Sequence, residues 1–263
     1  MTRLSVILIT KDESTNIHAC LGSVRWADEI VVVDGGSRDD TVAICREYTD
    51  KVYVREDWSG FGPQKNRALS YATGEWVLAV DADERVSPTL RLAIEQAMIS
   101  DRFVGYEIPR RSSYCGRVLR HGGWWPDHVL RLFKREQGRF SNRRIHEKVI
   151  VTGPSGRLQE PLIHETFRCL EEVLDKINSH SSEGAQLLYE QGKRGGLWPA
   201  LSHGLWAFIK TYFFRAGLLD GREGLMLSIS NAEGVYYRYL KLAYLNRKAD
   251  GKPVLDTGRA SKP

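Results

Sequence analysis

Two aspartates stand directly after one of the most apolar runs of the sequence. The segment Val80-Asp81-Ala82-Asp83-Glu84 follows residues 76–80. A short run that is apolar throughout is typical of a buried parallel strand, and open α/β sheets bind ligands beyond the carboxyl ends of such strands. Two neighbouring carboxylates favour a cation between them. The pattern therefore indicates a cation-binding site at an edge where ligands bind; the simpler alternative is a solvated acidic turn that caps the next helix.

Polar residues also follow the first two apolar runs. Residues 4–9 end in Thr10-Lys11-Asp12-Glu13, and residues 29–33 end in Asp34, which Gly35-Gly36-Ser37 follows. Glycines permit a tight turn with the backbone close to a ligand, and an aspartate at a strand end can accept hydrogen bonds from a ribose or a base edge. A dinucleotide site is disfavoured because no Gly-x-Gly-x-x-Gly follows the first run. Three successive strands thus end in polar clusters at one edge of the predicted sheet.

Alternating apolar runs and helical spacings position these clusters. We expect strands at 4–9, 29–34, 51–55 and 76–80, and helices at 15–26, 39–48, 63–72 and 88–98, the last capped by Ser87. Beyond residue 100 we expect strands at 104–108, 129–133 and 148–151, a loop at 110–126, and helices at 171–190, 198–219 and 222–246. Strands separated by helices of this length predict an α/β fold with a mostly parallel sheet.

The same patterns divide the chain. We expect a catalytic domain over residues 1–170, a helical extension over 171–249 and a disordered tail over 250–263. Four cysteines without a Cys-x-x-Cys pair indicate free thiols in a reducing compartment. The N-terminal residues run straight into a strand, without the regions of a signal peptide, so we expect a cytoplasmic protein.

Charge is distributed unevenly along the chain. The formal net charge is +5, yet residues 102–150 carry 12 basic and 4 acidic residues, while residues 1–100 are acidic overall. A basic region fits nucleotide phosphates, an anionic membrane surface or nucleic acid, or else is a solvated arginine-rich surface. No nucleic-acid-binding motif is present, and the acidic N-terminal part opposes that partner.

Three motifs together resemble family 2 glycosyltransferases of the GT-A fold. They are Ser5-Val-Ile-Leu-Ile-Thr-Lys-Asp-Glu13, Val-Val-Asp34-Gly-Gly-Ser37 and Asp81-Ala-Asp83, within a resemblance that covers about the first 170 residues. Later motifs are similar to a branch of that family that includes the lipopolysaccharide inner-core β-1,4-glucosyltransferases: Gly122-Gly-Trp-Trp-Pro-Asp127, Arg131-Leu-Phe133, Ile145-His-Glu147, Leu162-Ile-His164 and Gly217-Leu-Leu-Asp-Gly-Arg-Glu-Gly224. The acceptor of that branch is a heptose carried on a lipid at the cytoplasmic face of the inner membrane.

The resemblance implies roles for individual residues toward a nucleotide-sugar donor. Asp12 and Asp34 would hold the uracil or the ribose, and Lys65 or Arg67 would line the donor pocket. Asp83 would bind Mg²⁺ or Mn²⁺ directly, and the cation would offset charge on the leaving nucleoside diphosphate. The complete set of donor-binding residues implied is Thr10, Asp12, Glu13, Asp34, Lys65, Arg67 and Asp81.

Asp127 aligns with the general base of the family, although the usual Glu-Asp pair is Pro126-Asp127 here. A single displacement with this base would invert the anomeric centre. Two histidines compete as the additional metal ligand. We favour His146, which lies in a basic stretch, over His164, which ends an apolar run.

The predicted activity is therefore transfer of a hexose, glucose in that branch, from a UDP-linked donor to a glycolipid such as the lipopolysaccharide inner core. Another lipid-linked or polysaccharide acceptor is the alternative within this class. A nucleotidyltransferase is the alternative from another class, but residues 10–16 lack the glycine-rich loop that it needs.

The C-terminal stretch predicts a peripheral attachment to an anionic membrane. Residues 193–248 carry nine basic and three acidic residues among many aromatic ones, which suits an amphipathic helix at a membrane interface. We expect Lys210, Arg215, Arg238 and Lys241 to face lipid phosphates. The alternative is that these helices pack on the catalytic domain or on a second copy of the chain in a homo-oligomer. Trp124 and Trp125 either stack on a sugar or pack within their loop.

Overall fold

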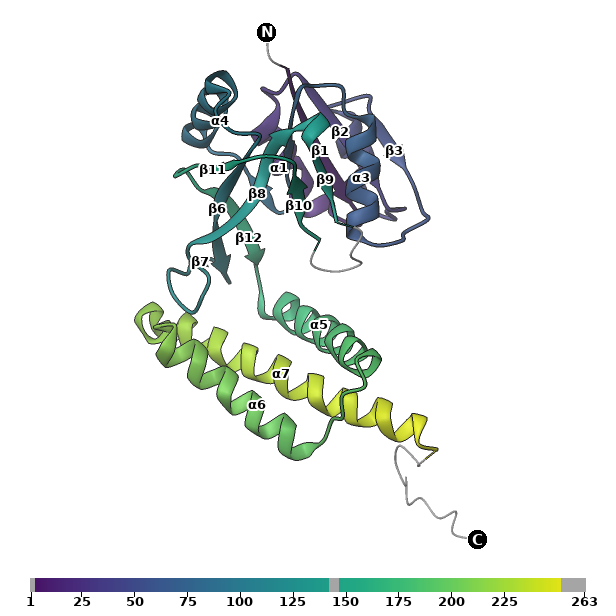
Figure 1. Ribbon diagram of the computed structural model, residues 1–263, viewed down its shortest axis with the longest axis vertical. Helices are drawn as coiled ribbons and strands as arrows, with labels where there is room; N and C mark the ends of the chain where they lie inside the picture. Colours follow the sequence, from purple (N-terminus) through teal and green to yellow (C-terminus); the bar gives the residue numbers. More distant parts are fainter. Residues whose placement is uncertain (1–2, 142–146, 252–263) are drawn as a thin grey trace. The chain divides into compact units, whose positions relative to one another are not determined.

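The computed structural model describes residues 3–141 and 147–251 (Figure 1). The chain forms two compact units. The first contains Met1–Ser112 and Pro126–Thr166, and the second contains Ser113–Trp125 and Phe167–Pro263.

Four parallel strands form one half of the main sheet in the first unit. They lie in the order β3-β2-β1-β4, with β1 at Leu4–Thr10, β2 at Glu29–Asp34, β3 at Val52–Val54 and β4 at Trp76–Ala79. Strands β1, β2 and β4 are buried along their whole length, which is why they are apolar almost throughout. The helices of this half are α1 (Ser14–Val24), α2 (Thr41–Arg46), α3 (Phe61–Tyr71) and α4 (Pro88–Ser100). The predicted α/β pattern of this region is confirmed.

The other half of the sheet contains antiparallel pairs, so the sheet is mixed. Its path continues β4-β8-β6-β12-β5, with β5 at Glu84–Arg85, β6 at Gly105–Tyr114, β8 at Asp127–Lys134 and β12 at Leu162–Phe167. Strands β4 and β8, β8 and β6, and β12 and β5 run antiparallel. Two short strands pair with β6, namely β7 (Arg117–Val118) and β11 (Ser155–Arg157), and a 3₁₀ turn at Arg135–Gln137 leads into a separate hairpin of β9 (Gly138–Phe140) and β10 (Val149–Val151). The loop expected from residue 110 thus begins five residues late, at residue 115, because β6 continues to Tyr114.

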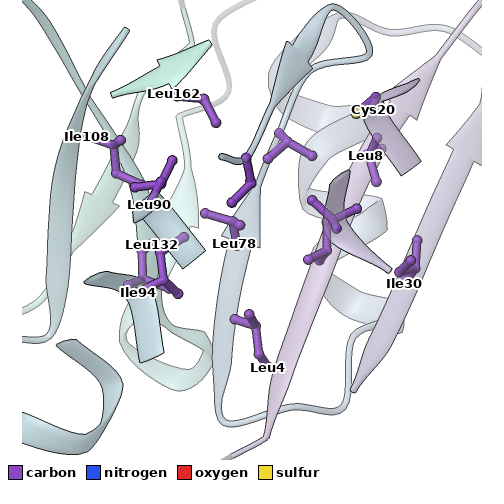
Figure 2. Close-up of a cluster of buried hydrophobic side chains, with 14 of the residues drawn as sticks. Leu4, Leu8, Cys20, Ile30, Leu78, Leu90, Ile94, Ile108, Leu132 and Leu162 are labelled. Atoms are coloured by element: carbon purple, nitrogen blue, oxygen red, sulfur yellow. The ribbon is translucent and has the colours of Figure 1, made fainter. Parts of the chain in front are cut away.

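Two apolar layers cover the two faces of the sheet. The larger layer packs α1, α2 and α4 against one face; Figure 2 shows part of it, with labels on Leu4, Leu8, Cys20, Ile30, Leu78, Leu90, Ile94, Ile108, Leu132 and Leu162. The smaller layer packs α3 and the β9–β10 hairpin against the other face. Truncating a fully buried leucine such as Leu78 to alanine removes about 2–5 kcal/mol of stability. This packing fixes the strand ends that carry the site.

The second unit is mainly helical. It contains α5 (Leu170–Glu190), α6 (Leu197–Ile209), a π-helical turn at Lys210–Phe214, a 3₁₀ turn at Gly217–Asp220 and α7 (Gly221–Ala249). The helix expected at 198–219 ends early because Ala216 adopts a left-handed φ of 54°, which breaks the helical path. In the described part of the chain, no helix is both long and apolar enough to cross a bilayer.

Candidate active site

The turn after β2 is built around Asp34. This side chain is fully buried, and its Oδ1 accepts hydrogen bonds from the backbone N–H groups of Gly36 (2.9 Å) and Ser37 (2.8 Å). Its Oδ2 accepts from the hydroxyls of Thr10 (3.0 Å) and Ser37. A carboxylate has about four acceptor positions, so the turn occupies them all. Asp34 therefore shapes the turn, and the direct nucleotide contact predicted for it requires one of these bonds to open.

The loops after β1 and β2 are joined by further hydrogen bonds. Asp12 has a left-handed φ of 55°, and its Oδ1 accepts from the N–H of Arg38 at 2.7 Å. The N–H of Glu13 donates to the hydroxyl of Thr41 at 2.8 Å, and the Glu13 carboxylate accepts from Asn16. Asp12 is exposed and Glu13 half-buried. Asp12 and Glu13, which the sequence predicts to bind the donor, thus lie in the loop after β1, and hydrogen bonds with the loop after β2 hold that loop in place.

Asp81, the first aspartate after β4, is held by two cations. Lys65 Nζ lies 2.8 Å from Asp81 Oδ1, and Arg131 Nη2 donates to Asp81 Oδ2. Burial by itself raises the pKa of Asp81, but Arg131 and Lys65 outweigh this effect and hold the pKa well below its usual range. Asp81 is therefore an anion fixed between a lysine on α3 and an arginine on β8.

A second carboxylate, Glu84, completes this cluster. It is fully buried, accepts from Arg131 Nη2 at 2.6 Å, and accepts from the backbone N–H of Asp81 at 2.9 Å. Burial and the charge of Asp81 raise the pKa of Glu84, against the lowering effect of Arg131. Burial would lower the pKa of Arg131, but its two carboxylate partners raise it instead. Arg131 is thus the cation on which both acids depend.

Asp83 faces His164. The distance from Asp83 Oδ2 to His164 Nε2 is 3.3 Å, and the other ring nitrogen, Nδ1, lies 2.9 Å from the Ser112 hydroxyl and 3.1 Å from the Thr166 hydroxyl. The antiparallel register of β12 and β5 places His164 opposite Glu84 and so brings it to the aspartate loop. Because hydroxyls both donate and accept, they fit either tautomer of the imidazole. The structure thus joins His164 to Asp83.

The favoured histidine, His146, lies outside the described residues. In the structure, only His164 of the two candidates can therefore be placed against the aspartates. Within residues 3–141 and 147–251, no three His, Cys, Asp or Glu side chains gather closely enough to hold a metal ion without further ligands.

Asp127, the candidate base, is the first residue of β8. It pairs with Arg110 of β6 in the sheet register, and Arg110 donates to Asp127 Oδ2 from Nε (2.9 Å) and from Nη2. Arg110 also lies 3.8 Å from Glu84. A continuous chain of charges therefore links Asp127, through Arg110, Glu84 and Arg131, to Asp81.

The two basic candidates on α3 differ in their surroundings. Lys65 is buried and contacts both Asp81 and Glu147, the latter at 2.7 Å. Arg67 pairs with Asp57, an exposed residue, and with Gln64. Residues two apart on a helix point in different directions. Of this pair, Lys65 is the one that the fold brings to the aspartates.

Four members of the cluster had no assigned role in the sequence reasoning: Glu84, Arg110, Arg131 and Glu147. Glu84 adjoins the aspartate pair, and Arg131 and Glu147 lie within quoted motifs, so these three carried a signal. Arg110 carried none, because its contact with Asp127 depends on the register of β6 and β8.

The tryptophan pair belongs to the second unit. Trp124 packs edge-on against Tyr114, with ring centroids 5.9 Å apart, and against Phe167 at 6.2 Å. Trp124 is therefore part of a small core that also contains Leu119 and Leu227, whereas Trp125 is partly exposed. Packing accounts for Trp124, and sugar stacking remains open only for Trp125.

Comparison with known proteins identifies the family. The family model described as Glycosyl transferase family 2 matches residues 5–162. The chain is 31% identical, over 96% of both chains, to the lipopolysaccharide core biosynthesis glycosyltransferase LpsC of Rhizobium meliloti, and 32% identical to an uncharacterized glycosyltransferase of Rickettsia prowazekii over 95% of this chain and 89% of that one. Among solved structures, TarS of S. aureus bound to UDP-GlcNAc superposes with a TM-score of 0.49 at 15% identity, over 97% of this chain and 95% of that one. On the family match and these full-length relatives, the chain is a glycosyltransferase and belongs to glycosyl transferase family 2.

Proposed function

We propose that this protein is an inverting, metal-dependent hexosyltransferase that moves glucose from a UDP-linked donor to a lipopolysaccharide inner-core acceptor. The observation that carries the proposal is the pairing of Asp83 with His164 beside the cation-held Asp81, at the carboxyl end of β4. An aspartate, a histidine and two cations suit a metal-bound diphosphate better than a neutral ligand.

The donor diphosphate is assigned to the cluster of Asp81, Asp83, Lys65 and Arg131. Lys65 and Arg131 are the cations that lie nearest to the aspartate loop, and both are buried. In a partly buried site a cation attracts phosphate more strongly than it does in water. We assign the nucleoside to the joined loops around Asp12 and Asp34, which follow β1 and β2 at the same edge of the sheet.

The donor set fits Mg²⁺ or Mn²⁺. Asp83 supplies a carboxylate oxygen and His164 a ring nitrogen, and hard divalent cations take about six ligands, so donor oxygens and water supply the rest. When bound, the cation offsets the charge that develops on the leaving diphosphate. Ser112 and Thr166 contact Nδ1 of His164, while Nε2 faces Asp83, so the two side chains would hold the cation together.

Asp127 is assigned as the general base. Arg110 bonds only to Oδ2, and among the described residues Oδ1 has no hydrogen-bond partner, so this oxygen is available to an acceptor hydroxyl. As the hydroxyl oxygen bonds to the anomeric carbon, its proton passes to Asp127 and the bond from that carbon to the diphosphate oxygen breaks. One such displacement inverts the anomeric centre and gives a β-linkage from an α-linked donor.

The acceptor assignment has separate support. The name of LpsC, which matches along nearly its whole length, places that relative in lipopolysaccharide core biosynthesis. Another lipid-linked or polysaccharide acceptor remains the alternative. A lipid-linked acceptor also implies work at a membrane, which we assign to the cytoplasmic face of the inner membrane.

A donor screen tests the proposal. Binding of UDP-glucose and other nucleotide sugars to the full chain is measured by calorimetry with Mn²⁺ and with EDTA, and the transfer product is then identified on lipopolysaccharide core acceptors. We expect Mn²⁺-dependent binding that Asp83→Asn abolishes and that Asp57→Asn, a change in an exposed carboxylate outside the cluster, preserves. Full donor binding in EDTA would overturn the metal dependence, and a retained anomeric configuration would overturn the base assignment.

A further inference from the structure

An unusual number of large apolar side chains are exposed on one segment of the second unit. They belong to α6 and to the π-helical and 3₁₀ turns after it, and we call them the α6 surface: Leu197, Trp198, Leu201, Leu205, Trp206, Phe213, Phe214, Leu218 and Leu219. Trp198 is 79% exposed and Phe214 74%. Contiguous exposed apolar patches of this kind mark a binding surface.

The opposite side of α6 is fixed by close packing. Ala200, Gly204 and Thr211 are buried, and a Cβ at Gly204 would lie 3.2 Å from the carbonyl oxygen of Ala232 on α7. Helix α6 therefore approaches α7 through its small residues and cannot rotate to bury its large ones. The α6 surface stays directed away from α7.

The charges within the segment that carries this surface have one sign. Between Lys193 and Leu219 the sequence holds four basic residues and no acidic residue. Two of the four, Lys210 and Arg215, lie in or next to the π-helical turn and are exposed. An apolar surface bordered by cations is complementary to the headgroups and upper acyl chains of an anionic bilayer.

The structure also removes one residue, Lys241, from the predicted membrane contact. Lys241 Nζ donates to the carbonyl oxygen of Asn178 (2.8 Å) and to the Ser181 hydroxyl (2.8 Å), which joins α7 to α5. Arg238 lies against Gly184 of α5, and its Nε is buried. The Lys241 ammonium is thus engaged inside the helical unit, so the expectation that it faces lipid phosphates is wrong; the expectation for Arg238 stays a prediction.

We infer that the α6 surface docks this protein on an anionic membrane, with α6 lying in the plane of the interface. The 13 residues of α6 extend about 20 Å, less than the ~30 Å of a bilayer core, so an in-plane orientation is the one that buries its apolar side. The inference rests on the proposed function in one respect: docking would bring the enzyme to a lipid-linked acceptor.

A second copy of the chain fits this surface less well. A two-fold interface places the same patch on both partners. Lys210 and Arg215 would then face a patch whose segment holds no acidic residue, and like charges across an interface disfavour association.

Co-sedimentation of the full chain with vesicles tests the inference. We expect binding to phosphatidylglycerol-containing vesicles, weak binding to phosphatidylcholine vesicles, and partial release by salt. Removing both charges in Lys210→Gln/Arg215→Gln should weaken partitioning about 30-fold, since each basic residue near such a surface contributes roughly fivefold. Lys176→Gln/Lys248→Gln, which removes two exposed charges of the same unit elsewhere, should change it little.

An apolar pair of variants separates surface docking from general stickiness. Trp198→Ser should lower vesicle binding, while Ile99→Ser, at an equally exposed position on α4, should not. Equal effects of the two, or no sedimentation at low salt, would overturn the inference. So would a dimer in lipid-free sedimentation velocity that Trp198→Ser dissociates. Nucleotide-sugar binding is measured on the parent protein and on every variant. If the parent protein does not bind a nucleotide sugar, the proposed function fails. If it binds the nucleotide sugar but not the vesicles, only the inference about the α6 surface fails.

Discussion

Replacing Arg131 by methionine tests whether the charges of the site depend on one another. Arg131 is 8% exposed, and it donates to both Asp81 and Glu84, of which Glu84 is completely buried. Methionine is similar in length and apolar, so the change removes the charge while leaving most of the packing. Among the described residues it leaves Asp81 with Lys65 at 2.8 Å, and it leaves the buried Glu84 with Arg110 at 3.8 Å, beyond hydrogen-bond distance.

The expected loss is large for a single residue. Removing one partner of a buried ion pair costs about 3–5 kcal/mol, because the remaining charge is stranded without solvent. Typical domains are stable by about 5–15 kcal/mol, so we expect a clear fall in the urea midpoint of Arg131→Met at pH 7. The control Arg91→Met removes an exposed arginine that pairs with Glu95, and it should cost about 0.5 kcal/mol or less.

A second substitution and a change of pH sharpen this test. Glu84→Gln added to Arg131→Met removes the stranded charge and should recover about 1–3 kcal/mol. Without Arg131, the pKa of Glu84, already raised by burial, rises further. When the pKa of an acid is higher in the folded than in the unfolded state, the folded state becomes more stable as the pH falls toward the pKa of the unfolded chain. The substitution Arg131→Met should therefore cost less free energy of unfolding at pH 5 than at pH 7. Circular dichroism in urea at both pH values measures this. A loss below about 1 kcal/mol, or strictly additive costs in the double variant, would refute the reasoning.

Three further predictions concern the remaining parts of the protein. His164→Gln should weaken Mn²⁺-dependent donor binding by about tenfold or more while the urea midpoint stays nearly constant, and unchanged calorimetric affinity would exclude His164 as a ligand. Asp127→Asn should lower kcat by at least about a hundredfold with little change in donor affinity, as steady-state and binding data together can decide. Burial raises the pKa of Glu29, but hydrogen bonds from Lys51, Ser5 and Thr73 outweigh it and lower the pKa to about 2. Its stabilisation is therefore present above pH 4.5 and lost as the pH falls toward 2; Glu29→Gln should cost roughly 2–3 kcal/mol at pH 7 and flatten that acid dependence in denaturation curves, and an unchanged acid slope would contradict the assignment.

The sequence predicts the position of the aspartates better than their partners. Strand β4 is identifiable because it is apolar throughout, and its end places Asp81 and Asp83 at the sheet edge. Arg131 reaches the same place only because β8 pairs antiparallel with β4, with Leu132 opposite Leu78. Pairing between strands so far apart in the chain leaves no periodic signal in the sequence.

The helical unit shows the same limit. Apolar spacing predicts its helices, with α5 beginning one residue before the expected start. The hydrogen bonds from Lys241 to α5 were not predictable. A lysine on a helix surface occupies the same position in the sequence pattern whether it faces lipid or bonds to a neighbouring helix. The left-handed Ala216 that ends the helical path gave no signal either, since alanine is the strongest helix former and left-handed positions usually hold glycine or asparagine.

The hydrogen bonds around Asp34 have a consequence for how fast a donor is captured. The ends of β1 and β2 and the loops after them hold each other through Asp34, Asp12 and Glu13. Ordering one backbone residue costs about 1–2 kcal/mol, and here that entropy is already lost on folding. This part of the site is therefore preorganised, and the nucleoside end of a donor should associate in a single concentration-dependent phase, with no slower isomerisation of these loops behind it.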